Sequence, residues 1–388
     1  MSVDNLVAIS RLYGSNPEYI VAGGGNTSFK DEKTLYIKES GTSLADCTAD
    51  TFVKMDRTVL AKIWENTYPE DPDKRESAVL EDMMSAKMAG EEHKRPSVET
   101  LLHDLLPFAY VVHTHPALIN GLTCSKEGEK AAERIFGGNA GNVNIALWIP
   151  SVNPGYILSL TVKKAMADYA AKKGKAPSII LLQNHGVFVG ANTTEEINLI
   201  YKNIADNINA YIKHKPNLSG EVSGWKTSCA TFPVLKDLAE SAGDGERFVS
   251  FRRNAGIISV VENRSAFAPV SSALSPDHIV YAGSDPLFVE TNTENLDQIS
   301  SDIKTAWDNH LTTFGKAPKT VAIQGLGVFG IGTSEKAAGL ALDLFCDAIK
   351  VAVYAEAFGG VQFMPKHQID FINNWEVERY RTNVSVGK

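Results

Sequence analysis

A repeat within the chain limits its fold more than any other feature of the sequence. Residues 176–188 read APSIILLQNHGVF, and residues 317–329 read APKTVAIQGLGVF. Each stretch is a short apolar run typical of a buried strand, followed by a turn and a second apolar run. Each then continues through a Thr/Ser-Glu helix start into a long helical pattern. A strand–turn–strand–helix unit that occurs twice, 141 positions apart, predicts two related domains.

Length and composition agree with two domains. The chain has 388 residues, about twice the size of an average domain. Short apolar runs alternate with helical patterns, which predicts an α/β protein. A polar stretch at 215–224 separates the copies, and we expect domains at 1–216 and 225–388. Because the second copy carries Leu326 where the first carries His185, we expect catalysis in the first domain and a degenerate second domain without metal ligands.

Charge and cysteine usage argue against several classes of function. The formal net charge is -8, and no dense block of Lys and Arg suggests a nucleic-acid-binding surface. No apolar run approaches the roughly 18 residues of a membrane span, and the first residues lack the pattern of a signal peptide. The 4 cysteines form no C-x-x-C pair, which indicates reduced thiols. We therefore expect a cytoplasmic protein with no nucleic-acid or membrane partner.

A His-x-His pair is the sharpest local sign of chemistry. His113 and His115 follow an apolar run, and residues two apart on a strand point to the same side. A third histidine, His185, follows another apolar strand and precedes Gly186. Three imidazoles that leave one position open are the pattern of a catalytic zinc site, so we expect these histidines to bind Zn²⁺. A pair of ordinary surface or core histidines is the alternative for the first two.

Pro96, Ser97 and Glu99 open a predicted helix. Proline suits the first helical position, Ser97 can cap the helix, and Glu99 falls in the first turn. Beside a bound cation, the Glu99 carboxylate can move a proton at a carbon next to a carbonyl. The alternative is that Glu99 belongs to a simple capping box. His103 lies one helical turn after Glu99 and can support it there.

Small polar turns offer a site for an anion. The glycine-rich turn at 23–28 and the turn at 40–43 expose backbone N–H groups and hydroxyls, and a serine opens the helix described above. None ends in Gly-Lys-Ser/Thr, which argues against a nucleoside triphosphate. Simple tight turns are the alternative. We expect a substrate phosphate to bind Asn26, Ser28, Ser40, Gly41 and Ser97.

A glycine pattern at 325–330 offers a rival function. It satisfies G-x-G-x-x-G after a predicted strand, as in dinucleotide-binding proteins. In such proteins the helix begins within the glycines, whereas here apolar residues continue and the helix start comes at 333–334. The repeat explains these glycines better, so we do not expect a nicotinamide cofactor.

Taken together, these motifs resemble the class II aldolase/adducin family. The Gly-Gly-Asn-Thr-Ser turn, the Ser-Gly turn, Pro-Ser-x-Glu, His-Thr-His-Pro and Asn-His-Gly occur in the order typical of that family. The likeness is strongest to the aldolase portion of bifunctional rhamnulose-1-phosphate aldolase/lactaldehyde dehydrogenase proteins. It is most evident over 95–108 and fainter over most of the chain.

The resemblance implies a three-layer αβα fold in a homo-oligomer, so that, with the repeat, we expect two tandem αβα domains of which the second is degenerate. It implies zinc on the three histidines, phosphate on Asn26, Ser40, Gly41 and Ser97, and Glu99 as the residue that moves the proton. The implied reaction is retro-aldol cleavage of a phosphorylated deoxy-ketose, similar to rhamnulose 1-phosphate, to dihydroxyacetone phosphate and an aldehyde such as lactaldehyde.

Two residues depart from the family pattern, and three other functions stay open. Val98 stands where related aldolases often carry a serine, and Glu39 stands where glycine is frequent, beside the expected phosphate. A pentulose-phosphate 4-epimerase shares the three histidines, although Glu99 favours aldol cleavage. An adducin-like, non-catalytic scaffold and a zinc hydrolase are the remaining alternatives.

Overall fold

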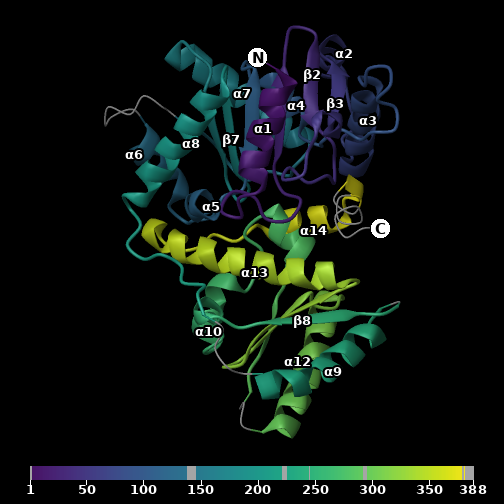
Figure 1. Cartoon of the computed structure of the whole chain (residues 1–388), viewed down its shortest axis with the longest axis vertical. Helices are drawn as coiled ribbons and strands as arrows, with labels where there is room; N and C mark the ends of the chain where they lie inside the picture. Colours follow the sequence, from purple (N-terminus) through teal and green to yellow (C-terminus); the bar gives the residue numbers. More distant parts are fainter. Residues whose placement is uncertain are drawn as a thin grey trace. The chain divides into compact units, whose positions relative to one another are not determined.

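The computed structural model describes residues 2–137, 146–220, 225–243, 245–291, 295–377 and 380. The chain forms two compact units, which Figure 1 shows in sequence colours. Unit 1 contains residues 1–123, 127–211 and 370–388, and unit 2 contains residues 124–126 and 212–369. The main division between the units falls between residues 211 and 212.

The C-terminal residues differ from expectation, because residues 370–388 group with unit 1 rather than with the second domain. Trp375 is buried in unit 1 beside Gly155. Arg95 donates two hydrogen bonds to the Glu376 carboxylate, at 3.1 and 2.7 Å. These tertiary contacts involve residues far apart in the sequence, so a composition-based boundary does not reveal them.

The described strands of unit 1 form a seven-stranded sheet in the order β3-β2-β1-β4-β7-β6-β5. Neighbouring strands are antiparallel except β5 and β6, which are parallel. Strand β4 lies in the middle, between β1 and β7. The strands are β1 Asn26–Lys30, β2 Thr34–Lys38, β3 Phe52–Asp56, β4 Tyr110–Thr114, β5 Ala146–Ile149, β6 Ile179–Leu182 and β7 Gly186–Ala191.

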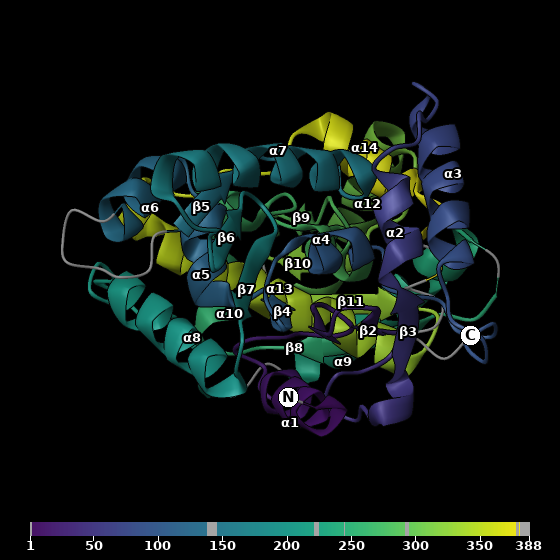
Figure 2. The ribbon, with the colours of Figure 1, turned by 90° about the horizontal axis from the view of Figure 1, so that it is seen from above.

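Helices cover both faces of this sheet, which makes unit 1 an αβα sandwich. Figure 2 shows α4 and α7 on one side of the strands and α1 and α8 on the other. Helices α2 and α3 pack with α4 and α7, and α5 packs against α8. The bounds are α1 Val3–Gly14, η1 Ala49–Thr51, α2 Arg57–Ile63, α3 Pro72–Ser85, α4 Thr100–Leu105, α5 Ala117–Thr123, α6 Gly128–Phe136, α7 Tyr156–Lys173 and α8 Thr194–Asn209.

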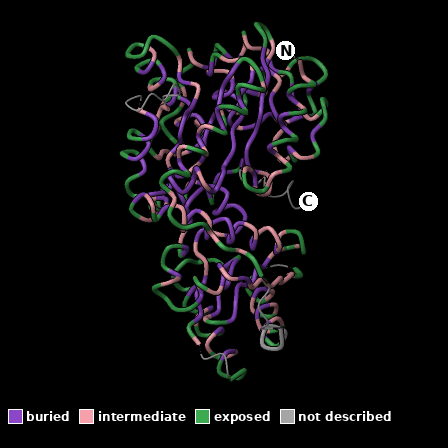
Figure 3. Tube along the Cα trace, turned by 60° about the vertical axis from the view of Figure 1, so that its left-hand side comes forward, coloured by how far each residue is buried: buried purple, intermediate pink, exposed green. Residues whose placement is uncertain are grey.

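Local sequence explains how several of these elements begin and end. At the start of α8, the Thr193 hydroxyl accepts a bond from the Glu196 N–H, and the Glu196 carboxylate accepts one from the Thr193 N–H. Helix α7 ends at Gly174, which has the left-handed backbone conformation. Strands β1, β4 and β7 are buried along their whole length, as Figure 3 shows for the centre of the sheet. Burial on both faces matches the largely apolar sequences of β4 and β7, whereas β1 buries the polar side chains of Asn26, Thr27 and Ser28.

The described strands of unit 2 form a smaller sheet in the order β8-β11-β10-β9. Helices α9 and α12 lie on one face, and α13 with α10 lies on the other (Figure 1). The strands are β8 Phe248–Arg252, β9 Leu287–Val289, β10 Thr320–Ile323 and β11 Gly327–Gly332. The helices are α9 Trp225–Ser241, α10 Ala255–Val260, α11 Arg264–Phe267, η2 Ala268–Val270, η3 His278–Ala282, α12 Leu296–Phe314, α13 Glu335–Ala355, η4 Glu356–Phe358 and α14 Lys366–Asn374, which continues into unit 1.

The structure confirms the repeat predicted from the sequence. A shift of 141 positions superimposes the bounds of β6 on those of β10, the bounds of β7 on those of β11, and the first residue of α8 on that of α13. The glycines at 327 and 330 lie on β11, and α13 begins only at Glu335 after its cap, Ser334. No helix begins within the glycines of this fully described stretch, so it lacks the geometry of a dinucleotide-binding turn.

Candidate metal and proton-transfer site

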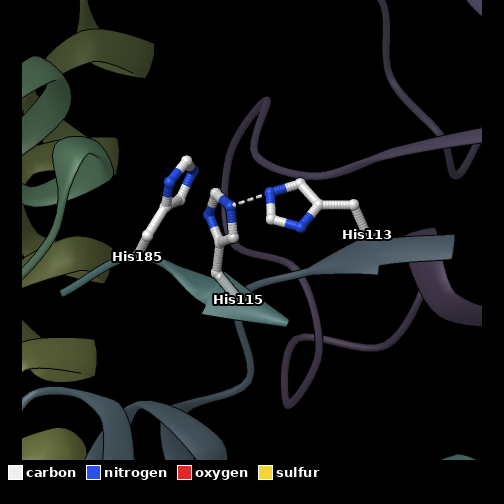
Figure 4. Close-up of side chains that lie close together, drawn as sticks. All are labelled: His113, His115 and His185. Carbon is white, nitrogen blue, oxygen red and sulfur yellow. Dashed lines mark hydrogen bonds between the residues drawn. The ribbon is translucent and has the colours of Figure 1, made fainter. Parts of the chain in front are cut away.

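Sheet pairing brings the three histidines together in unit 1. His113 lies on β4, His115 follows two residues later, and His185 lies in the turn between β6 and β7. Because β4 and β7 pair in antiparallel register, with His113 opposite Phe188, the end of β4 meets that turn. One nitrogen from each ring lies within 4.8 Å of the others, and Figure 4 shows the three rings converging.

Hydrogen bonding orients the His113 ring for metal binding. Its Nδ1–H donates to the Val187 carbonyl oxygen at 3.0 Å, so Nε2 carries the lone pair. That Nε2 lies 2.8 Å from Nε2 of His115 (Figure 4). The fully buried His113 ring also stacks on Phe188, with centroids 4.0 Å apart and an interplanar angle of 17°. A fixed ring with its inner nitrogen unprotonated is what a metal ligand requires.

Gly186 allows the turn to lie against the second histidine. A Cβ atom at this position would be 2.5 Å from the Thr114 carbonyl oxygen and 2.6 Å from Cδ2 of His115. Both distances are far shorter than van der Waals contact, so a side chain here would displace the His115 ring. The glycine of the Asn-His-Gly sequence is therefore part of the geometry of the site.

Glu99 faces two of the three histidines. Its Oε2 lies 3.4 Å from Nε2 of His113, and its Oε1 lies 3.5 Å from Nε2 of His185. We expected Glu99 in the first turn of the helix, but α4 begins at Thr100 and Glu99 is its cap residue, without a capping side-chain bond. The carboxylate is therefore not part of a capping box. Ser97 instead takes a cap-like role, because its hydroxyl accepts from the Glu99 N–H at 3.3 Å.

The donor set fits a divalent cation. Nitrogen ligands bind zinc at about 2.0–2.1 Å, so three imidazole nitrogens this close can share one ion after small side-chain rotations. In addition, Glu99 Oε1 is buried and has no hydrogen-bond partner among the described residues. An unpaired carboxylate oxygen in the interior is costly, and a nearby cation or a proton would compensate it.

Two of the expected phosphate ligands are engaged in buried hydrogen bonds. Asn26 pairs with His113 between β1 and β4, and its Nδ2 donates to Glu99 Oε2 at 2.6 Å. Ser28 is fully buried on β1, and its hydroxyl lies 2.7 Å from Nδ1 of His103. The Ser28 hydroxyl therefore serves His103, and we leave Ser28 out of the phosphate site proposed below.

The other three expected phosphate ligands come together at a second place near Glu99. A β-bridge joins Glu39 to Pro96, and the Ser40 N–H donates to the Arg95 carbonyl at 2.8 Å. The Ser97 N–H donates to the Lys38 carbonyl at 3.1 Å. Ser40, Gly41 and Ser97 thus lie on two adjoining turns, with Ser97 two residues before Glu99. Partial burial raises the pKa of the Glu39 carboxyl in the same bridge.

His103 is more central than sequence reasoning indicated. It lies on α4 with no exposed surface, between Ser28 and Asn26. Burial, followed by the charges of His113 and Lys30, lowers the pKa of His103 well below its usual value, so the ring is neutral. The spacing from Glu99 on one helix was the available signal, but the bonds to β1 depend on the sheet.

Comparison with known proteins identifies the family. Residues 4–201 match the model of the class II aldolase and adducin N-terminal domain, and residues 226–381 match that of the aldolase class II second domain. This chain belongs to the class II aldolase and adducin family. The second match shows that both halves of this class II aldolase family member are aldolase-related, as the internal repeat predicted.

Three relatives illustrate the range of similarity to this family member. YuxG of Bacillus subtilis, named an uncharacterized oxidoreductase, is 28% identical over an alignment of 428 positions, which covers 99% of this chain and 58% of YuxG. The chain thus spans less than two thirds of that relative. The N-terminal class II aldolase domain of a conserved protein from Thermoplasma acidophilum is 26% identical, covers 54% of this chain and 93% of that one, and gives a TM-score of 0.45. L-fuculose-1-phosphate aldolase from Thermus thermophilus is 16% identical. The match covers 54% of this chain and 95% of that one, with a TM-score of 0.34.

Among the helices that the structure describes, none combines the length and apolar character needed to cross a membrane.

Proposed function

We propose that unit 1 catalyses the zinc-dependent retro-aldol cleavage of a phosphorylated deoxy-ketose, similar to rhamnulose 1-phosphate. The products would be dihydroxyacetone phosphate and an aldehyde such as lactaldehyde. The observation that carries this proposal is the buried carboxylate of Glu99 between His113 and His185, whose Oε1 accepts no hydrogen bond from the residues that the structure describes. In this reading unit 1 is the catalytic domain, and unit 2 is a degenerate domain without metal ligands.

His113, His115 and His185 would hold the zinc ion. When bound, zinc acts as a Lewis acid that polarises a carbonyl and stabilises the negative charge developing on its oxygen. Imidazole is a preferred zinc ligand, and three such ligands leave a position for substrate. The bond from His113 Nδ1 to Val187 favours the tautomer that this role needs.

Glu99 would transfer a proton to and from C3 of the ketose. In cleavage the C3–C4 bond of the ketose breaks, its electron pair stays on C3, and the C4 hydroxyl becomes an aldehyde as it loses a proton. Glu99 would deliver one proton to C3, so the protons balance. In the reverse direction the same carboxylate takes that proton from C3. Its burial and its position beside the imidazoles support this role.

Ser40, Gly41, Ser97 and Asn26 would bind the substrate phosphate. The two adjoining turns supply the Ser40 and Ser97 hydroxyls and the Gly41 N–H, which are suited to a phosphate in a protein of net charge -8. Glu39 lies beside these groups, in the β-bridge to Pro96. We also propose that the protein acts in the cytoplasm as a homo-oligomer.

Hydrogen exchange on dihydroxyacetone phosphate tests this proposal without knowledge of the aldehyde. The enzyme in D₂O should replace one hydrogen at C3 of dihydroxyacetone phosphate with deuterium, as measured by proton NMR. Glu99→Gln should retain about one zinc per chain but lose exchange by about 10²–10⁴-fold, because a carboxamide cannot take the proton. The matched control Glu92→Gln removes an exposed carboxylate from the same region and should exchange at the wild-type rate.

A screen of ketose 1-phosphates, with and without chelator, then separates the alternatives. Release of dihydroxyacetone phosphate that requires metal supports the aldolase. A change of configuration without net cleavage would indicate an epimerase, and a product other than dihydroxyacetone phosphate would indicate a hydrolase. Zinc-free wild-type protein without turnover after zinc addition would favour the scaffold.

A further inference from the structure

A line of buried hydrogen bonds leads from β1 through α4 to Glu99. The Ser28 hydroxyl lies 2.7 Å from His103 Nδ1, His103 Nε2 bonds to Asn26 Oδ1, and Asn26 Nδ2 donates to Glu99 Oε2 at 2.6 Å. The exposed fractions of these side chains are 0% for Ser28 and His103, 6% for Asn26 and 7% for Glu99. The line is thus shielded from water, where hydrogen bonds are strong and unpaired groups are costly.

The chemistry of the four groups fixes the direction of every bond. The Asn26 NH₂ group donates to Glu99 Oε2, so Oδ1 of the same amide faces His103. Because Oδ1 only accepts, His103 Nε2 must carry the ring proton. A neutral imidazole has one N–H, so Nδ1 accepts and the Ser28 hydroxyl donates to it. The lowered pKa of His103, caused first by burial, agrees with a neutral ring.

The line also distinguishes the two oxygens of Glu99. Oε2 is held by Asn26, whereas Oε1 has no hydrogen-bond partner among the described residues and lies 3.5 Å from His185 Nε2. With the Asn26 amide turned over, its Oδ1 would face Oε2, and two acceptors would repel each other. The His103 Nε2–H adds to this preference, because a turned amide would place its NH₂ group against that N–H.

The surroundings hold His103 itself firmly. The main-chain carbonyl oxygen of His103 accepts a hydrogen bond from Lys30 Nζ at 2.6 Å. Its main-chain N–H donates to the Glu99 carbonyl oxygen at 3.1 Å. The His103 and Phe188 rings make a T-shaped contact, with centroids 5.3 Å apart, and Phe188 stacks on His113. One phenylalanine therefore supports both a proposed metal ligand and the histidine behind Asn26.

We propose that His103 is a positioning residue that fixes the Asn26 amide and thereby leaves Glu99 Oε1 as the oxygen that transfers the proton. This role rests on the proposed function of Glu99. Asn26 then has a second role besides phosphate binding, because its amide also holds the Glu99 carboxylate. His103 touches no reacting atom and acts only through Asn26.

Two substitutions at one position test this role. His103→Met fills the space but removes the donor, whereas His103→Gln places an N–H near the position of Nε2. We expect His103→Met to lower kcat for exchange of dihydroxyacetone phosphate by about 10–100-fold, as for other residues that orient catalytic groups. Its KM and its zinc content should stay within about twofold of wild type. His103→Gln should recover kcat to within about fivefold, which a purely structural role would not require.

A measurement independent of activity separates this proposal from the proposed function. In protein labelled with ¹⁵N-histidine, two-bond ¹H–¹⁵N correlations should show the Nε2–H tautomer for His103, assigned by its loss in His103→Gln. An Nδ1–H tautomer, or equal kcat in wild type and His103→Met, would overturn the positioning role. If the wild type neither exchanges nor cleaves any substrate while the Nε2–H tautomer is found, the proposed function fails and the hydrogen-bond direction stands.

A further variant keeps the test valid if both His103 variants are unfolded. Ser28→Ala removes the donor to Nδ1, keeps Nε2–H in place, and should lower kcat by less than about tenfold. A loss as large as that expected for His103→Met would contradict the proposal. The proposal requires the His103–Asn26 bond to matter more for kcat than the Ser28–His103 bond.

Discussion

The three histidine positions of unit 1 have direct counterparts in unit 2. His113 lies opposite Phe188 in the pairing of β4 with β7, and Phe251 lies opposite Phe329 in the pairing of β8 with β11. The residue two places later is His115 in unit 1 and Arg253 in unit 2. The repeat matches His185 to Leu326. The same backbone thus presents three imidazoles in one unit and a phenylalanine, an arginine and a leucine in the other.

The turn between the last two strands shows how alike the backbones are. Asn184, before His185, has φ 56°, and Gly325, before Leu326, has φ 66°. Both therefore have the left-handed conformation, which glycine and asparagine tolerate best. In unit 2, Arg253 Nη1 donates to the carbonyl oxygens of Gly325, at 2.8 Å, and of Leu326. A positively charged side chain binds this turn, and the described residues of unit 2 contain no metal-ligand cluster.

The comparison teaches that the strand–turn–strand–helix unit folds without the proposed metal site. In unit 2, Leu326 and Phe329 join a core with residues of α9, α12 and β9–β11. Burial of such side chains is worth about 1.5–3 kcal/mol each, which is sufficient reason for the turn to form. The histidines of unit 1 are therefore a chemical addition to a backbone that apolar packing already stabilises.

The largest expected effect comes from giving unit 1 the residue of unit 2. We predict that His185→Leu removes most of the bound zinc and lowers turnover by about 10³-fold or more, because a metal contributes several kcal/mol to such reactions. Metal analysis by mass spectrometry and the exchange assay measure the two effects. The matched control Leu326→Met conserves volume in unit 2 and should leave both unchanged. Full zinc occupancy in His185→Leu would remove this histidine from the site.

An intermediate effect concerns β1, a strand that has no counterpart in the described part of unit 2. Burial lowers the pKa of Lys30 to about 7, with Asp104 opposing and Arg57 adding to the shift. The unfolded chain keeps its proton up to about pH 10.4. Between these pH values the unfolded state binds more protons, so the free energy of unfolding should rise with pH.

Lys30→Met should remove this pH dependence. Each unit of pKa shift corresponds to about 1.4 kcal/mol, so the variant should be more stable than wild type by a few kcal/mol at pH 6–7. The advantage should shrink towards pH 10. Urea unfolding at several pH values, followed by a probe of unit 1, measures the difference. A constant difference across pH 6–10 would show that Lys30 is not neutralised by burial.

The smallest effect tests whether the two turns share one conformation. Gly325→Asn gives unit 2 the residue that unit 1 carries at Asn184, and it should change the free energy of unfolding by less than about 1 kcal/mol. Gly325→Val should cost about 1–2 kcal/mol or more, because β-branched residues avoid positive φ. Urea midpoints compare the two variants. Equal losses would mean that the asparagine is not tolerated here and that the turns differ.

Sequence reasoning reached the parts of this molecule that depend on local pattern. The repeat was visible because β6, β7 and α8 recur as one continuous stretch, and the His-x-His spacing places two rings on one side of β4. The convergence with His185 followed from the ends of neighbouring strands. The role of each histidine as a ligand stays a prediction.

Other features could not be predicted because they depend on how distant segments pack. His103 bonds to Ser28 and Asn26 only because α4 lies over β1, and no spacing in the sequence reveals that orientation. Glu99 was expected inside the helix, whereas the chain begins α4 one residue later and frees the carboxylate. Trp375 beside Gly155 and the Arg95–Glu376 pair likewise join segments that are far apart in the sequence.

The place of β4 has a consequence for engineering. In unit 1 this strand is flanked on both sides, and β1, beyond it, brings Asn26 beside Glu99. In the described part of unit 2 the matching strand, β8, forms the border of the sheet and lacks such a neighbour. Installing histidines at 251, 253 and 326 would therefore create at most a chelating protein without turnover. A catalyst made from unit 2 would need a grafted hairpin as well as new ligands.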